Sequence, residues 1–161
     1  MGKARFLLVI LALASSRAAG AIVSVPAPTC APVAQIGADG QRLGASGFSL
    51  LSSPGNPALP YKDIRLVIPP NVIPTSLSVS LSGSTHNIVP AQQEIAPAPP
   101  IALSDQGREI RDWGPGKQIQ GNRNVLVYGR SAFYPASHVE IIGSGSLRRW
   151  RIATVRYYPF R

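Results

Sequence analysis

Few residues of this 161-residue chain could take part in chemistry. Cys30 is its one cysteine, and its two histidines are His86 and His138. A thiol becomes a nucleophile when a histidine takes its proton, and the spacing alone neither pairs these residues nor excludes a pair. Cys30 stands in the proline-rich stretch SVPAPTCAPVAQ, which offers no rigid element to hold a nucleophile. The residues therefore favour a chain without thiol catalysis and leave the pairing itself open.

The carboxylates and the known catalytic motifs point the same way. Asp105, Glu109 and Asp112 share one stretch, but they are too few and too dispersed for a calcium loop. The sequence contains no G-x-S-x-G, H-E-x-x-H or C-x-x-C motif and no glycine-rich phosphate loop. The GSGS stretch at 143–146 is typical of a tight hairpin turn. We expect a non-catalytic chain that needs no metal or cofactor.

The charge of the chain is basic, with 16 lysines and arginines against 7 acidic residues and a net charge of +9. In LRRWR (147–151) an aromatic residue stands among arginines, a pattern that sheets binding single-stranded nucleic acid also use. Trp150 is more simply a core residue whose neighbours are solvated. The basic residues are interleaved with acids, so we expect a solvated surface, or one that faces an acidic partner, and no nucleic acid. An oligonucleotide-binding barrel is a minor alternative.

The N-terminus has the pattern of a secretory signal peptide over residues 1–21. Lys3 and Arg5 precede an apolar run from Phe6 to Ala14, and an A-x-A arrangement ends at Ala21. The run is too short to span a bilayer, so we expect no stable membrane anchor. Export would place the protein in the periplasm, on the cell surface or outside the cell. Residues 22–45, rich in Ala, Pro and Gly, indicate a leader, and the folded domain is expected at 46–161.

The rest of the chain favours short strands. In residues 54–70 prolines bracket an alternation that places Ile64, Leu66 and Ile68 on one face. Leu77, Val79 and Leu81 alternate with serines in the same way. No mature segment shows a clean helical period. The sequence therefore predicts an all-β fold, an antiparallel β-sandwich of jelly-roll type. Further strands are expected at 46–52, 125–129, 138–143 and 147–158, the last with a bulge near Ile152, and a long loop is expected at 104–124.

Four segments, in order, resemble the N-terminal prodomain of the gingipain family of secreted cysteine proteases. They are GNPALPY followed by a strand, EIAPAPP, VYGRSAFYP at 127–135, and VEIIGSGSLRRWRIATVRYYP at 139–159. The resemblance runs from about Ser53 to Pro159. It implies a propeptide that helps its protease to fold, blocks the active site of the zymogen and is then removed. The implied partner is a cognate cysteine protease catalytic domain in the same precursor, and that domain would follow Arg161.

The resemblance also implies which residues contact the protease. Family prodomains are thought to insert a loop into the substrate cleft, with a basic side chain in the pocket for the residue before the scissile bond. The corresponding loop falls in 104–124, where Arg108 and Arg111 are the candidates, with Lys117 behind them. A cation that enters a carboxylate-lined pocket gains a charge-assisted hydrogen bond. The alternative for these arginines is an ordinary solvated loop. The alternative function for the whole chain is a non-catalytic secreted β-sandwich module for adhesion or surface assembly.

Overall fold

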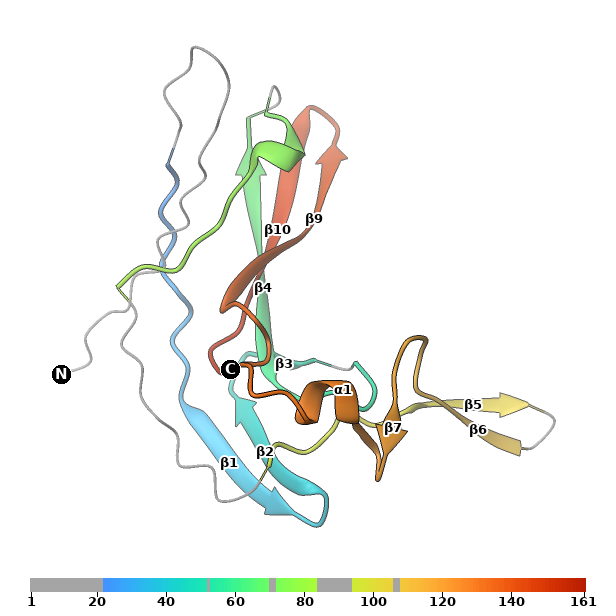
Figure 1. Ribbon diagram of the computed structural model, residues 1–161. Coiled ribbons are helices and arrows are strands. Elements are labelled where there is room, and N and C mark those ends of the chain that lie inside the picture. The colour runs from blue at the N-terminus through green and yellow to red at the C-terminus, as the bar shows by residue number, and fades with distance from the viewer. Residues whose placement is uncertain (1–21, 52, 70–71, 84–93, 106–107) are drawn as a thin grey trace. The chain divides into compact units, whose positions relative to one another are not determined.

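The computed structural model describes residues 22–51, 53–69, 72–83, 94–105 and 108–161 (Figure 1). Strands predominate in these residues, the sheets are antiparallel, and the single α-helix of the described part has four residues. The expectation of an all-β chain is confirmed at this level. No helix within the described ranges has the length and hydropathy to cross a membrane. The expected signal peptide and His86 both lie outside the described residues.

The chain divides into two compact units, and each is described by itself. The first unit takes its residues from 1–30, 61–88 and 137–159. The second takes them from 31–60, 89–136 and 160–161.

A three-stranded antiparallel arrangement organises the first unit. β4 (Pro60–Ile68) and β9 (Val139–Leu147) lie on either side of β10 (Trp150–Tyr157). The period-two alternation of β4 works as the sequence predicts, because Ile68 is buried while Val67 beside it is 62% exposed. On β10, Ala153, Val155 and Tyr157 form the buried face. This side of the sheet carries the apolar core of the unit.

The hairpin of β9 and β10 differs from the sequence expectation in three ways. The turn consists of Arg148 and Arg149, while GSGS lies inside β9, so the predicted GSGS turn is wrong. The register shifts between Thr154 and Val155, two residues beyond the expected position of the bulge. Trp150 is 50% exposed, so its assignment to the core is also wrong. The extra residue of this irregularity is Ile142 on β9, so β10 alternates without interruption. Ala153, Val155 and Tyr157 are therefore buried, and Trp150 falls on the other face.

The segment 75–83 keeps its expected alternation without forming a strand. Leu77, Val79 and Leu81 are half-buried, and Ser78 and Ser80 are exposed. The chain enters through a 3₁₀ turn, η1 (Pro74–Ser76), and has no ladder pairing afterwards. An alternating apolar pattern needs only one buried side, and that side can be supplied without a neighbouring strand.

The second unit begins where a leader was expected. β1 (Pro32–Gly37) and β2 (Gly40–Ala45) form a hairpin, and Gln41 and Leu43 are buried at 3% and 6% exposure. The expectation that 22–45 lacks core elements is therefore wrong. The next strand, β3 (Ser49–Leu50), has two residues and falls within the expected strand 46–52.

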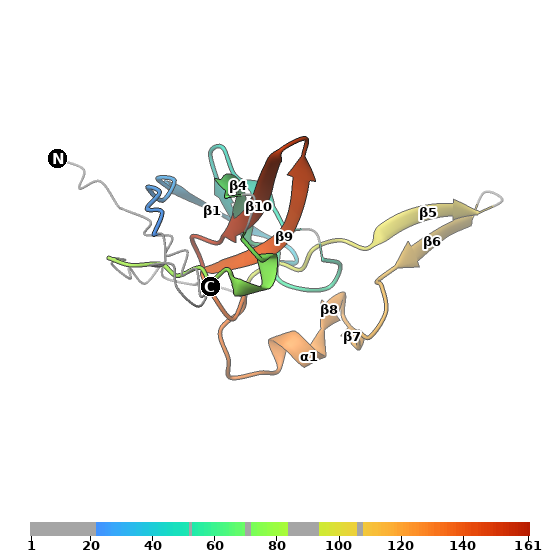
Figure 2. The same cartoon turned by 90° about the horizontal axis from the view of Figure 1, so that it is seen from above.

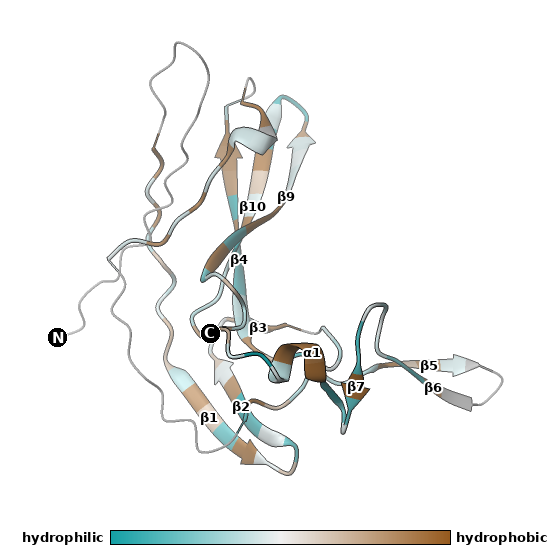
Figure 3. Cartoon of the chain, in the orientation of Figure 1, coloured by the Kyte–Doolittle hydropathy of each residue, from teal (hydrophilic) through white to brown (hydrophobic). Residues whose placement is uncertain are grey.

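The remaining elements of the second unit replace the expected loop at 104–124. β5 (Ile101–Asp105) and β6 (Arg108–Asp112) form one hairpin, and β7 (Ile119–Gln120) and β8 (Arg123–Asn124) form a second, short one. The expected strand at 125–129 is instead α1 (Val125–Tyr128), an apolar turn in Figure 3. Asn124 makes the difference, because its side-chain oxygen accepts a hydrogen bond from the Leu126 N–H and caps the helix.

Candidate functional site

The hairpin of β5 and β6 is the element that holds the sequence-predicted contact residues. Leu103 stands opposite Ile110, and Ala102 stands opposite Arg111. Directly opposed residues share a face, so the hairpin has one face with Ile101, Leu103 and Ile110 and another with Arg111. The three apolar side chains are 53%, 48% and 46% exposed. Within the described residues the two strands pair only with each other, and Figures 1 and 2 show them extending away from β7 and α1.

Arg108 and Arg111 occupy different places on this hairpin. Arg108 is the first residue of β6 and stands opposite Asp105, the last residue of β5, at the free end of the hairpin. Arg111 is three residues further back and exposed. The two arginines therefore stand at different register positions along β6.

Lys117 serves the fold of the second unit. Its Nζ donates a hydrogen bond of 2.7 Å to the Pro54 carbonyl oxygen and one of 3.2 Å to Ser53 Oγ. The structure therefore separates Lys117 from the two arginines. Its cation secures the 53–54 turn, and it stands away from the end of the hairpin.

Segments far apart in the sequence meet behind the hairpin. The Gly55 N–H donates a hydrogen bond of 2.8 Å to the Ala98 carbonyl oxygen. The Ala58 N–H donates to the Ala96 carbonyl at 3.0 Å, and the Asn124 N–H donates to the Gly55 carbonyl at 2.8 Å. Gly55 has φ +77°, a left-handed conformation that suits glycine, and a Cβ there would lie 2.7 Å from Ile119 Cδ1. The proline-rich pieces GNPALP and EIAPA thus form one hydrogen-bonded base for the hairpin.

Two asparagines and two tyrosines complete this base. Asn124 is 5% exposed, and its Nδ2 donates to Asn56 Oδ1 at 2.9 Å. Asn56 Nδ2 in turn lies 3.4 Å from the Tyr134 hydroxyl. Tyr128 donates its hydroxyl hydrogen to the Ile95 carbonyl at 2.7 Å. Burial raises the pKa of Tyr128 to about 12, against the opposing charge of nearby Arg123.

A pocket of about 540 Å³ lies beside the polar face of the hairpin within the second unit. Its floor is made of small apolar residues, among them Ala58, Ala96 and Ala98, and Trp113 contributes to its lining. Arg42 and Arg111 line it as cations, with Asp39 as the acid. Such a pocket suits a short apolar segment that carries negative charge. Arg42 and Trp113 could not be found from the sequence, because β2 and the residue that follows β6 meet at this pocket only in the folded unit.

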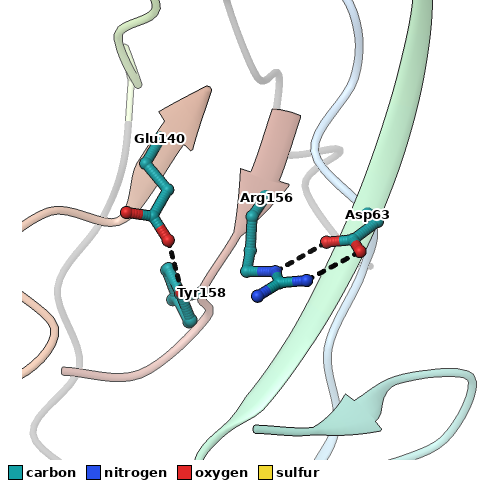
Figure 4. A network of polar contacts seen from close by, with 4 residues as sticks. All are labelled: Asp63, Glu140, Arg156 and Tyr158. Carbon is teal, nitrogen blue, oxygen red and sulfur yellow. Dashed lines mark hydrogen bonds and ion pairs between the residues drawn. The ribbon is translucent and has the colours of Figure 1, made fainter. Parts of the chain in front are cut away.

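The polar network of the first unit is built for structure. Arg156 donates two hydrogen bonds to the Asp63 carboxylate, at 2.8 and 2.9 Å (Figure 4). Its guanidinium carbon also lies 4.0 Å from the centre of the Tyr61 ring. The hydrogen bond to Asp63 raises the pKa of Arg156. The Tyr158 hydroxyl donates to Glu140 at 2.5 Å, and burial, strengthened by that carboxylate, raises the pKa of Tyr158. Each charged group is satisfied by a neighbour, so the network clamps β4 to β10.

The other residues considered for chemistry do not form a metal site. His138 Nδ1 lies 2.8 Å from the Tyr158 carbonyl oxygen, and Cys30 is half-buried in the same unit. Among the described residues no three His, Cys, Asp or Glu side chains gather as metal ligands would. Comparison of the chain with protein-family models, with curated proteins and with solved structures gave no match.

Proposed function

We propose that this chain is the prodomain of a secreted, gingipain-like cysteine protease, where it acts as intramolecular chaperone and as inhibitor of the protease domain. The proposal rests on the sequence resemblance, and one structural observation supports it. The β5 and β6 hairpin pairs only with itself among the described residues, and three of its apolar side chains are about half exposed. A surface of that kind on a two-stranded ribbon suits contact with a partner.

The hairpin has the chemistry that a protease cleft would require. An extended strand can be bound by backbone hydrogen bonds, with alternate side chains entering pockets. Arg108, at the free end, would enter the pocket for the residue before the scissile bond. Its guanidinium would then form a charge-assisted, bidentate hydrogen bond with a carboxylate in the pocket. Ile101, Leu103 and Ile110 would bury their exposed surface against the rim of the cleft.

The base of the hairpin explains how such a segment would be held in place. Lys117 and Asn124 tie the segment after β6 to the 53–56 turn through the hydrogen bonds described above. The hairpin therefore projects from a fixed platform, which lowers the entropy lost on binding. Lys117 would then support the hairpin from behind, with Arg108 and Arg111 as the proposed contacts with the protease.

The remaining features are proposed with it. The antiparallel sheets would belong to a β-sandwich, the chain would be exported through the signal peptide at 1–21, and it would have no catalytic activity of its own. The cognate catalytic domain of the precursor would be its partner.

Inhibition of the cognate protease tests the proposal directly. The purified chain should slow hydrolysis of a peptide substrate by the protease that is encoded with it. Arg108→Ala should weaken this inhibition by tenfold or more, because a desolvated charged hydrogen bond contributes about 1.5–3 kcal/mol. Arg130→Ala is the matched control, since Arg130 is exposed and lies outside the hairpin. Equal inhibition by the Arg108→Ala chain and the parent would refute the assignment of the hairpin. Absence of inhibition by the parent would refute the function.

A further inference from the structure

The first unit exposes apolar side chains at one end of its sheet, beside the turn between β9 and β10. Trp150 and Leu147 stand opposite each other next to the turn and are 50% and 61% exposed. Val67, on β4, is 62% exposed and stands opposite Ile152. Because residues two apart on a strand share a face, Val67 and Trp150 lie on the same outer face. We call Val67, Leu147 and Trp150 the turn-end patch.

Glycine leaves this patch open. Gly145 stands opposite Ile152 and Gly143 stands opposite Thr154, so β9 places no side chain on the outer face next to these β10 residues. A Cβ at either glycine would meet no atom within 4 Å. The outer face is therefore flat beside Trp150, and the indole is not covered from that side. In Figure 3 the end of β4 near the turn is hydrophobic as well.

Cations surround the patch. Arg148 and Arg149 form the two-residue turn, and the guanidinium carbon of Arg149 lies 5.2 Å from the centre of the Trp150 ring. Arg65 lies on the same outer face, since it stands opposite Thr154. Arg151 is held at this end by a hydrogen bond of 2.7 Å to the Val72 carbonyl.

The acidic residues of this unit lie at the other end of the sheet. Asp63 and Glu140 both stand opposite Arg156, six residues from Trp150 along β10. At ~3.3 Å per residue this is roughly 20 Å, about twice the distance over which physiological salt screens a charge. Among the charges of this unit, those near the turn are therefore arginines, and the fitting occupant is negatively charged.

We propose that the turn-end patch docks this protein reversibly on the surface of an anionic lipid bilayer. Tryptophan prefers the level of the lipid headgroups, where its ring is apolar on one side and hydrated on the other. Leu147 and Val67 would enter the acyl boundary, and Arg148 and Arg149 would meet the headgroup phosphates. An apolar patch with a cationic rim, at the end of a sheet, satisfies both requirements at once.

A single-stranded nucleic acid is the other polyanion to consider, and the outer face fits it less well. Strand binding uses successive aromatic platforms for successive bases. On the outer face of these three strands the second aromatic residue is Tyr61, which lies at the far end beneath Arg156. Leu147 and Val67 offer nothing to a base stack, whereas a bilayer uses them.

Co-sedimentation with vesicles tests the proposal on the full chain. We expect binding to phosphatidylcholine vesicles that contain phosphatidylglycerol, a blue shift of tryptophan emission on binding, and weak binding to phosphatidylcholine alone. Leu147→Ser with Trp150→Ser should lower binding at least tenfold. Arg148→Gln with Arg149→Gln should lower it by roughly fivefold per arginine, since each contributes about 1 kcal/mol near an anionic surface. Trp150→Phe should retain binding and lose the blue shift.

Matched control variants distinguish binding by the turn-end patch from nonspecific hydrophobic adsorption and from the effect of net charge. Val33 and Ile36 are apolar residues of similar exposure, 54% and 57%, in the other unit. Val33→Ser with Ile36→Ser should leave vesicle binding unchanged, as should Arg42→Gln with Arg130→Gln. Failure of the parent to bind anionic vesicles at low salt would overturn the proposal. Equal losses in the control variants would do so too, as would binding to a labelled oligonucleotide without binding to vesicles. Because the β5 and β6 hairpin is not involved, this result is independent of protease inhibition.

Discussion

Asn124 offers the sharpest test of how the second unit supports its hairpin. The residue is buried, its Oδ1 caps α1 at Leu126, and its Nδ2 donates to Asn56. Replacement by alanine removes the cap, which costs about 1 kcal/mol. It also leaves the amide oxygen of half-buried Asn56 without its donor, which costs another ~1–2 kcal/mol. We expect Asn124→Ala to lower the free energy of unfolding by roughly 2–3 kcal/mol.

The assay must report on the second unit. Trp113 lies in that unit and Trp150 in the other, so a Trp150→Phe background leaves Trp113 as the fluorescent reporter during urea unfolding. Asn124→Asp keeps the capping oxygen but loses the donor, and its stability should fall between those of the parent and Asn124→Ala. Gln120→Ala, at an exposed position of β7, is the control and should stay within about 0.5 kcal/mol of the parent. A loss of less than about 0.5 kcal/mol in Asn124→Ala would refute the idea that this network holds the unit together.

Three further predictions concern single positions. Gly55→Ala should lower the free energy of unfolding by about 1–3 kcal/mol, because φ is +77° and the new Cβ would press on Ile119. Urea unfolding measures this loss, and an unchanged midpoint would contradict the described conformation of Gly55. The raised pKa of Tyr128 means that the fold favours the neutral phenol, so its stabilising effect should be complete below about pH 10 and lost as the pH rises through about 12. Absorbance titration should show late tyrosines, because the pKa of Tyr158 is raised as well, and Tyr128→Phe should remove one of them. Arg156→Lys should lower the free energy of unfolding by about 0.5–1.5 kcal/mol, because lysine cannot bind the Asp63 carboxylate through two nitrogens. If a double-mutant cycle with Asp63→Asn shows no coupling energy, Arg156 and Asp63 do not hold β4 to β10.

The sequence is a good guide to the sheet of the first unit. The alternation of Ile64, Leu66 and Ile68 places β4 correctly, because one face of that strand is buried and the period follows from burial. β9 and β10 also lie within or near their expected ranges. These strands are long enough for a period-two pattern to repeat, which is the condition under which the pattern is informative.

Most elements of the second unit could not be predicted from the sequence, because their structure depends on contacts between distant residues. β1 and β2 are rich in Ala and Gly and show no period, yet the Gln41 N–H donates to the Glu94 carbonyl at 2.8 Å and fixes the hairpin from outside. The residues of α1 are Val, Leu, Val and Tyr, which favour a strand, and the cap at Asn124 overrides that preference. The loop expected at 104–124 contains β5's partner strand, since Ile110 pairs with Leu103.

Of the candidate site residues, the sequence places Arg108 and Arg111 on one segment but not at their positions opposite Asp105 and Ala102, because an expected loop carries no register. Lys117 could not be separated from them by sequence alone, since its hydrogen-bond partners, Ser53 and Pro54, lie more than sixty residues earlier. The turn-end patch could not be predicted from the sequence either, because its residues come from β4, β9 and β10 and share a face only in the observed register.

Trp150 shows why an aromatic residue is a poor guide to the core when the register is unknown. A bulge adds one residue to one strand, so a shift in its position changes which side chains of a hairpin share a face. Here the register shift between Thr154 and Val155 places the extra residue, Ile142, on β9, so β10 alternates throughout and Ala153 shares the buried face with Val155 and Tyr157. Trp150 must then lie outward, where Gly143 and Gly145 leave the sheet bare. An exposed indole costs free energy in water unless something covers it part of the time. The two arginines beside it limit what that cover can be, and this is the reason to test an anionic bilayer first.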